Sequence, residues 1–153
     1  MKIYIDADAC PKQVKEILYK TSFRLKVELI LVSNKSMNYP LSEYISSIVV
    51  ESGADVADDK IAFLVEKGDL VITADVPLAD RVIDKEALAL NPRGKLYSKE
   101  NIKESLGTRN FLDELRKSGV ETGGPRPLDK KNIQEFTNQL DKTLTKLLKT
   151  NKF

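Results

Sequence analysis

The chain has 153 residues, 41% of them hydrophobic and 31% charged, with a formal net charge of +2, which is typical of a single globular domain with a sound core. With no histidine and one cysteine, it excludes a Ser-His-Asp or Cys-His triad and an internal disulfide, and it favours oxygen ligation of Mg²⁺ or Mn²⁺ over a zinc site. No apolar run approaches the ~20 residues of a membrane span, and no leader peptide is visible, so we expect a cytoplasmic protein without membrane contact.

Strand-like and helix-like segments alternate along residues 1–95. We expect, in chain order, a strand over 2–5; a helix over 13–21, with Pro11 as its first helical residue and Cys10 near the cap; a strand over 25–33; a loop over 33–40; a strand over 44–52; a helix over 53–68, closed by Gly68; a strand over 69–73; a helix over 76–86; a strand over 87–90; and a turn over 91–95. The alternation predicts an α/β fold with a parallel sheet.

Residues 96–153 differ in character, and we treat them as a helical extension of the 1–95 core within one domain. They predict a helix over 98–119 that could break near Gly107, a loop over 120–127 and a long amphipathic helix over 129–149. The apolar face of the last helix consists of Ile133, Phe136, Leu140, Leu144, Leu147 and Leu148. This helix could pack on its own sheet or on a second copy in a homodimer.

Aspartates follow two of the predicted strands. Asp6 ends the first strand, with Asp8 two residues beyond it, and Asp75 lies two residues after the strand over 69–73. If these strands are neighbours in a parallel sheet, the three carboxylates converge at one edge. Asp8 could instead cap the next helix, whereas an acid at the end of a buried strand has no routine structural role. A divalent cation would offset the repulsion between the carboxylates, so we expect a metal site.

The helix within 53–68 adds a fourth acid. At about 100° per residue, Asp58 lies about 20° from the apolar Val65 and faces the sheet, whereas Asp59 lies about 120° from it and faces sideways or outward. Asp58 is therefore preferred to Asp59 as a metal ligand. The alternative is purely structural, with Asp55 capping the helix and Asp58 near the positive end of its dipole.

Five blocks, "IDADACP", "GADVADDKI", "DLVITADVPLA", "NPRG" and "TGGP", resemble the YaiI/YqxD family of bacterial proteins over nearly the whole chain. That family is similar in turn to PIN-like nuclease domains. The resemblance implies a PIN-like three-layer α/β/α sandwich with a mostly parallel sheet, and Mg²⁺- or Mn²⁺-dependent hydrolysis of phosphodiesters, RNA rather than DNA. It implies that Asp6, Asp58 (or Asp59) and the Thr73-x-Asp75 segment form the catalytic site, with Asp80 as a further candidate acid or a solvated one.

Charge is distributed unevenly. Residues 1–90 carry 11 Lys/Arg and 15 Asp/Glu, whereas residues 91–153 carry 14 and 8, so a net charge of −4 stands beside one of +6. A basic part could hold a polyanion over the acids, or it could be a set of solvated helix faces. Gly123-Gly124 could likewise be a phosphate contact or a plain linker. The candidates for substrate binding are Asn34, Thr73, Arg93, Lys95, Arg109, Gly123, Gly124 and Arg126.

Two other functions are consistent with the sequence. "IYIDADAC" resembles the signature of haloacid-dehalogenase phosphatases, with Asp6 as nucleophile, Asp8 as acid–base and Ser33 as a later motif, although Ala9-Cys10 replaces the usual Gly-Thr. The third hypothesis is a non-catalytic RNA-binding or regulatory module, which the clustered acids and the lack of an aromatic platform disfavour. The Cys10 thiol stands at a helix start, where its pKa could fall, but it has no histidine base.

Overall fold

Strands and helices alternate through the computed structural model, which describes residues 1–53, 55–121 and 127–150. The strands in this part of the chain are β1 (Lys2–Asp6), β2 (Glu28–Ser33), β3 (Ile45–Val49), β4 (Leu70–Ile72) and β5 (Leu88–Leu90). The helices are α1 (Lys12–Leu25), α2 (Val56–Leu64), α3 (Val76–Asp84), α4 (Lys99–Lys117) and α5 (Lys130–Thr150). No helix in the described ranges is long and apolar enough to cross a membrane.

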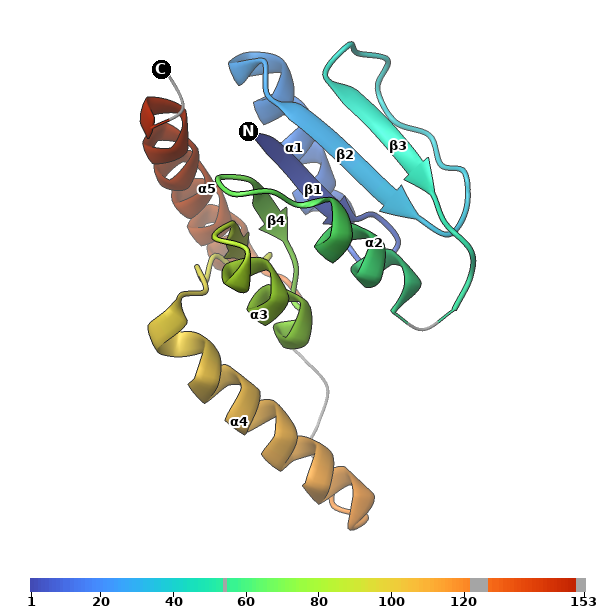
Figure 1. Ribbon diagram of the computed structural model, residues 1–153, viewed down its shortest axis with the longest axis vertical. Coiled ribbons are helices and arrows are strands. Elements are labelled where there is room, and N and C mark those ends of the chain that lie inside the picture. Colours follow the sequence, from blue (N-terminus) through green and yellow to red (C-terminus); the bar gives the residue numbers. More distant parts are fainter. Residues whose placement is uncertain (54, 122–126, 151–153) are drawn as a thin grey trace.

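The strands form one parallel sheet in the order β3-β2-β1-β4-β5 (Figure 1). From β1 the chain adds β2 and β3 on one side, and it then returns to add β4 and β5 on the other. The order therefore reverses between β1 and β4, where Ile5 lies opposite Ile72. In sheets of this kind, ligands bind beyond the carboxyl ends of the strands at such a switch point.

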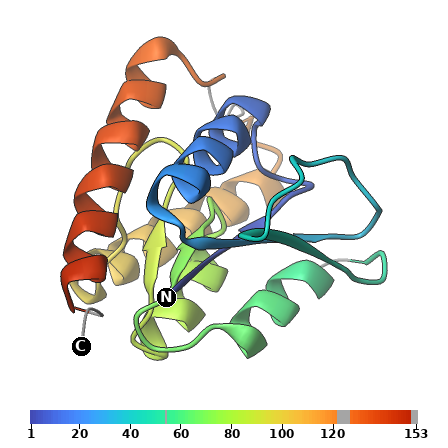
Figure 2. The ribbon, with the colours of Figure 1, turned by 90° about the horizontal axis from the view of Figure 1, so that it is seen from above.

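Helices cover both faces of the sheet (Figure 2). Side chains alternate between the faces along each strand. Ile3 and Ile5 join a buried cluster with α1 and α5, whereas Tyr4 and Val71 join a second cluster with α2 and α3. Helix α4 packs against α3 and adds the buried Ile102 to this second cluster. The α/β fold with a parallel sheet is therefore confirmed.

Helix α5 belongs to the main core. Its Phe136, Leu140 and Leu144 have no exposed surface and share one cluster with β1, β2 and α1. The turn after β5 also touches this helix. Gly94 has φ of +98°, and a Cβ there would lie 2.8 Å from the backbone carbon of Glu135, so only glycine fits without a shift.

Helix α1 begins directly after Pro11 and ends later than the sequence predicts. Pro11 is its N-cap, with an extended backbone, and is not the first helical residue as expected. The helix then continues to Leu25, so β2 begins at Glu28 and the prediction of a strand from residue 25 is wrong. The stop signal is Lys26 in the left-handed conformation, a position that glycine usually marks in a sequence.

Helix α2 is shorter than predicted, and α4 is not interrupted. Helix α2 ends at its C-cap Val65, where the backbone becomes extended and the side chain is buried. Gly68 is therefore not the cap and lies in the turn before β4. Helix α4 runs through Gly107 without a break, because a single exposed glycine costs a helix only about 1 kcal/mol.

Candidate metal and substrate site

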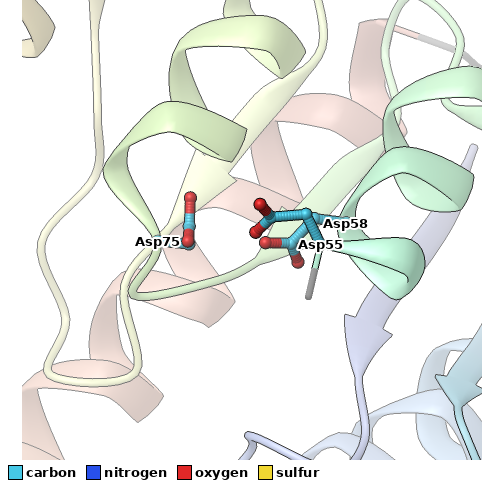
Figure 3. A group of neighbouring side chains, drawn as sticks. All are labelled: Asp55, Asp58 and Asp75. Atoms are coloured by element: carbon cyan, nitrogen blue, oxygen red, sulfur yellow. The ribbon is translucent and has the colours of Figure 1, made fainter. Parts of the chain in front are cut away.

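Acidic side chains from three elements meet beyond the ends of β1 and β4. Figure 3 shows Asp55 and Asp58 at the start of α2, with Asp75 facing them from the start of α3. Each offers a carboxylate oxygen that lies within 4.8 Å of those of the other two. Asp6, the last residue of β1, lines a cavity of about 130 Å³ with Asp58 and Asp75. The carboxylates of Asp55, Asp58 and Asp75 could hold a metal ion, and Asp6 lies beside them.

Asp75 is held in place by two hydrogen bonds. Its N–H donates to Thr73 Oγ1 (2.9 Å), and its Oδ1 accepts from the N–H of Leu78 (2.8 Å), so Asp75 is the N-cap of α3. The expectation that an acid after a buried strand has no routine structural role is therefore wrong for Asp75. The same two bonds fix the carboxylate's direction, and the buried Thr73 has a positioning role at the site.

Asp6 also has a structural role. Its Oδ1 accepts the N–H groups of Asp8 (3.1 Å) and Ala9 (3.4 Å) and so orders the turn after β1. Within the described part of the chain, Oδ2 accepts no such bond. Burial raises the pKa of Asp6, the two N–H groups lower it in part, and the charges of Asp8 and Asp75 raise it further.

Asp8 lies apart from the three close carboxylates. Its Oδ2 accepts the N–H of Asn34 (2.7 Å) and so joins the turn after β1 to the end of β2. Asp8 does not cap α1, whose N-cap has no side-chain bond. It shares a second hollow of about 120 Å³ with Asp6, Asn34 and Asp58, which places it and Asn34 on the rim of the site.

Asp58 and Asp59 point in different directions, as the helix phase predicts. Asp58 faces Asp55 and Asp75, whereas Asp59 forms an exposed ion pair with Arg81 of α3 at 2.6 Å. The inward position has an electrostatic consequence. Burial, the charges of Asp75, Asp6 and Asp55, and a hydrogen bond with Asp75 raise the pKa of Asp58 to about 6.

This raised pKa makes the metal-free fold sensitive to pH. The folded pKa of about 6 lies above the ordinary value of 3.8, so the stabilisation from neutral Asp58 is complete below about pH 4 and is lost as pH rises to 6. Because the group is half-buried, solvent screening reduces the effect to about 1–2 kcal/mol. In urea unfolding with EDTA, the stability of Asp58→Asn relative to wild type should therefore rise by this amount between pH 4 and pH 7. A difference that does not change with pH would contradict the raised pKa of Asp58.

The sequence suggested that Asp55 caps a helix, whereas the structure places it among the close carboxylates. It occupies the N-cap position of α2, but its side chain makes no capping bond and lies with Asp58 and Asp75 instead. Its backbone is left-handed (φ 64°, ψ 6°), which costs a non-glycine residue about 1–2 kcal/mol. The signal in the sequence was the spacing of Asp55 and Asp58, since residues three apart share a helix face.

The predicted basic contacts lie at different distances from the acids. Arg109 of α4 lines a hollow of about 150 Å³ with Asp55, Asp58 and Asp75. Lys95 does not line this hollow, and its Nζ donates a hydrogen bond to Ser105 Oγ of α4 (3.0 Å). Arg93 donates to Asn132 of α5 (3.0 Å) and so fastens the turn after β5 to that helix.

Several other candidates are not brought into the acidic cluster. Asp80 of α3 belongs neither to the three close carboxylates nor to the hollows beside them. Gly123, Gly124 and Arg126 lie outside the described residues. Burial raises the pKa of the Cys10 thiol to about 12, whereas a helix start could have lowered it, so the thiol is a poor nucleophile. The hydroxyl of the buried Ser33 donates to the Lys35 carbonyl (2.6 Å).

Comparison with known proteins gives a consistent result. The sequence profile described as "Uncharacterized BCR, YaiI/YqxD family" matches residues 4–146. A UPF0178 protein of Maridesulfovibrio salexigens is 55% identical over 148 residues, which cover 97% of this chain and 98% of the relative. UPF0178 proteins of Shewanella woodyi (56% over 146 residues; 95% and 97%) and Colwellia psychrerythraea (53% over 150 residues; 98% and 99%) are similar. No solved structure gave a significant match.

Proposed function

This chain belongs to the YaiI/YqxD family, and from that premise and the geometry of the acids we propose that it is a Mg²⁺- or Mn²⁺-dependent nuclease that hydrolyses phosphodiesters, RNA in preference to DNA. The names of the family and of its relatives state no activity, so the proposal rests on the site. The observation that carries it is the set of carboxylate oxygens from Asp55, Asp58 and Asp75 within 4.8 Å of one another.

The donor set fits a small, hard cation. In an octahedral site with bonds of 2.0–2.1 Å, adjacent ligand oxygens lie roughly 2.9 Å apart and opposite ones roughly 4 Å apart, so the three side chains would have to draw together around the ion. Every donor is a carboxylate oxygen, which suits Mg²⁺ and Mn²⁺. Burial and, after it, the charges of Asp75, Asp6 and Asp55 raise the pKa of Asp58, and a bound cation would offset both effects by favouring the ionised carboxylate. Asp55, Asp58 and Asp75 would hold the ion, with Asp6 as a further ligand.

The remaining groups have separate tasks in phosphodiester hydrolysis. A bound divalent ion supplies a more acidic water and offsets charge on the phosphate and the leaving oxygen. Asp75 keeps its direction through Thr73 and the start of α3. Asp6 lines the same cavity as Asp58 and Asp75, where its carboxylate would orient the attacking water and accept its proton. Arg109 stands across the acids, where its guanidinium would pair with a phosphate oxygen.

The phosphatase alternative has less support from the contacts. It needs Asp8 as an acid–base group beside Asp6 and a hydroxyl such as that of Ser33. Asp8 instead binds the N–H of Asn34, and the Ser33 hydroxyl donates to a backbone carbonyl. The carboxylates that share the cavity with Asp6 are those of Asp75, which follows β4, and of Asp58 in α2.

The test is metal-dependent cleavage. With MnCl₂, the protein should hydrolyse labelled RNA, labelled DNA more slowly, and bis(p-nitrophenyl) phosphate; EDTA should abolish the activity. Asp75→Asn should lower the rate by more than about 100-fold, or ~2.7 kcal/mol of transition-state stabilisation. Asparagine caps helices as well as aspartate does, so this variant keeps the start of α3 and removes only the charge.

The other outcomes would identify a different protein. Turnover of p-nitrophenyl phosphate without turnover of the diester would favour the phosphatase. RNA binding without hydrolysis under any metal would favour the non-catalytic binding module. Equal activity in wild type and Asp75→Asn would mean that the hydrolysis comes from a contaminant or another site.

A further inference from the structure

A groove of about 400 Å³ lies between α4 and the segment that leads into it from β5. Three basic side chains line it, Lys95, Arg109 and Arg116, with Glu104 as the acidic residue of its wall. Lys95 lies in the segment before α4, with its Nζ 5.7 Å from the ring centre of Tyr97, and the two arginines lie on α4, so both walls carry cationic groups. The groove is therefore mainly basic, whereas the neighbouring cluster of Asp55, Asp58 and Asp75 is acidic.

The groove and the acidic cluster adjoin each other. Arg109 lines both the groove and the hollow that contains Asp55, Asp58 and Asp75. Val76, which lines the groove, follows Asp75 directly in the chain. A ligand bound at the carboxylates through one phosphate could therefore continue into the groove.

The two arginines suit a ligand with repeated anionic groups. Arg109 and Arg116 are seven residues apart, so they lie on nearly the same face of α4, separated by about 10 Å along its axis. Both guanidinium groups bind Asp113, at 3.3 and 3.1 Å, which holds them toward one side. Even with Glu104 and Asp113 included, the group of Lys95 and the two arginines keeps a net positive charge.

We propose that this groove binds the sugar–phosphate backbone of a single-stranded nucleic acid next to the bond at the carboxylates; this inference rests on the proposed function. Its volume is at the lower end of the roughly 300–1,000 Å³ of ligand pockets, which suits a nucleotide-sized part of one strand. Because a duplex carries its phosphates on the outside of a rigid cylinder, we expect it to enter a groove of this volume less readily than a single strand does. Tyr97, the ring in the wall, is only 3% exposed, so it offers no stacking platform and the contact is independent of sequence.

Fluorescence anisotropy with a labelled 12-nucleotide single-stranded RNA, in EDTA to prevent cleavage, tests the groove. Arg116→Gln and Lys95→Gln should each raise Kd about 5- to 10-fold at low salt and reduce the slope of log K against log salt by about 0.7. Lys103→Gln, an exposed site on α4 outside the groove wall, is the matched control and should change Kd less than twofold. The same sequence as a duplex should bind at least tenfold more weakly.

The groove and the proposed function can fail separately, because binding is measured without metal and hydrolysis with it. Equal loss of affinity in Lys103→Gln and the groove variants, or equal affinity for the duplex, would overturn the groove assignment and leave the diesterase activity standing. Groove-dependent RNA binding in a protein that cleaves no diester would overturn the proposed function and leave the groove assignment standing.

Discussion

Replacing Asp58 by asparagine should weaken Mn²⁺ binding more than tenfold, whereas the same replacement at its neighbour Asp59 should leave it intact. Asp58 contributes one of the three close carboxylates, and Asp59 is paired with Arg81 on the protein surface. We expect Kd for Mn²⁺, measured by isothermal titration calorimetry at pH 7.5, to rise more than tenfold in Asp58→Asn, or at least about 1.4 kcal/mol.

Asp59→Asn is the control for Asp58→Asn, because both variants make the same change of charge at nearly the same place in the helix. Both remove one negative charge from adjacent residues of α2, and Asp59→Asn loses only an exposed ion pair worth about 0–1 kcal/mol. If Asp59→Asn weakens binding and Asp58→Asn does not, the direction assigned to these side chains is wrong. If wild type itself shows no saturable binding up to millimolar Mn²⁺, the carboxylates are not a metal site in the free protein.

Replacing Phe136 by alanine should remove a large part of the stability of the whole domain. Phe136 has no exposed surface and lies in the cluster that α5 shares with β1, β2 and α1. Removing a buried phenylalanine side chain costs about 3–5 kcal/mol, against a typical total of about 5–15 kcal/mol. Urea unfolding followed by circular dichroism would measure the loss.

The matched control is Phe111→Ala in α4. Its ring is 60% exposed, so the same chemical change should alter the unfolding free energy by no more than about 0.5 kcal/mol. A loss near 1 kcal/mol or less at Phe136 would mean that α5 is a loosely docked extension. That outcome would also favour treating residues 1–95 as the folding unit.

The periodicity of the sequence was sufficient to predict the alternating elements and the direction of Asp58. These features depend on local spacing, since side chains recur every second residue in a strand and about every 100° in a helix. The acids at the strand ends could likewise be found from sequence. Their convergence depended on β1 and β4 being neighbours, a long-range pairing that the structure supplies.

The features that were missed depend on backbone conformation and burial. Asp55 has the residue type and position of a helix cap, and only its left-handed backbone directs the side chain to the other acids. Cys10 looks activated at a helix start, but burial dominates its pKa. Asp75 was assigned a single role, although an aspartate directly before a helix with proline in its first turn is a sequence signal for an N-cap, and its Oδ1 accepts the N–H of Leu78.

The packing of α5 against the cluster that contains β1 has a consequence for biosynthesis. The strand partners of β1 are β2 and β4, whereas α5 joins the same buried cluster from the far end of the described chain. The part of the core that α5 completes therefore forms late and joins distant parts of the chain. Chains with such distant contacts fold more slowly than chains with local ones. We therefore expect a nascent chain to complete the cluster around β1 only after α5 has left the ribosome, so that incomplete translation products would be open to proteolysis.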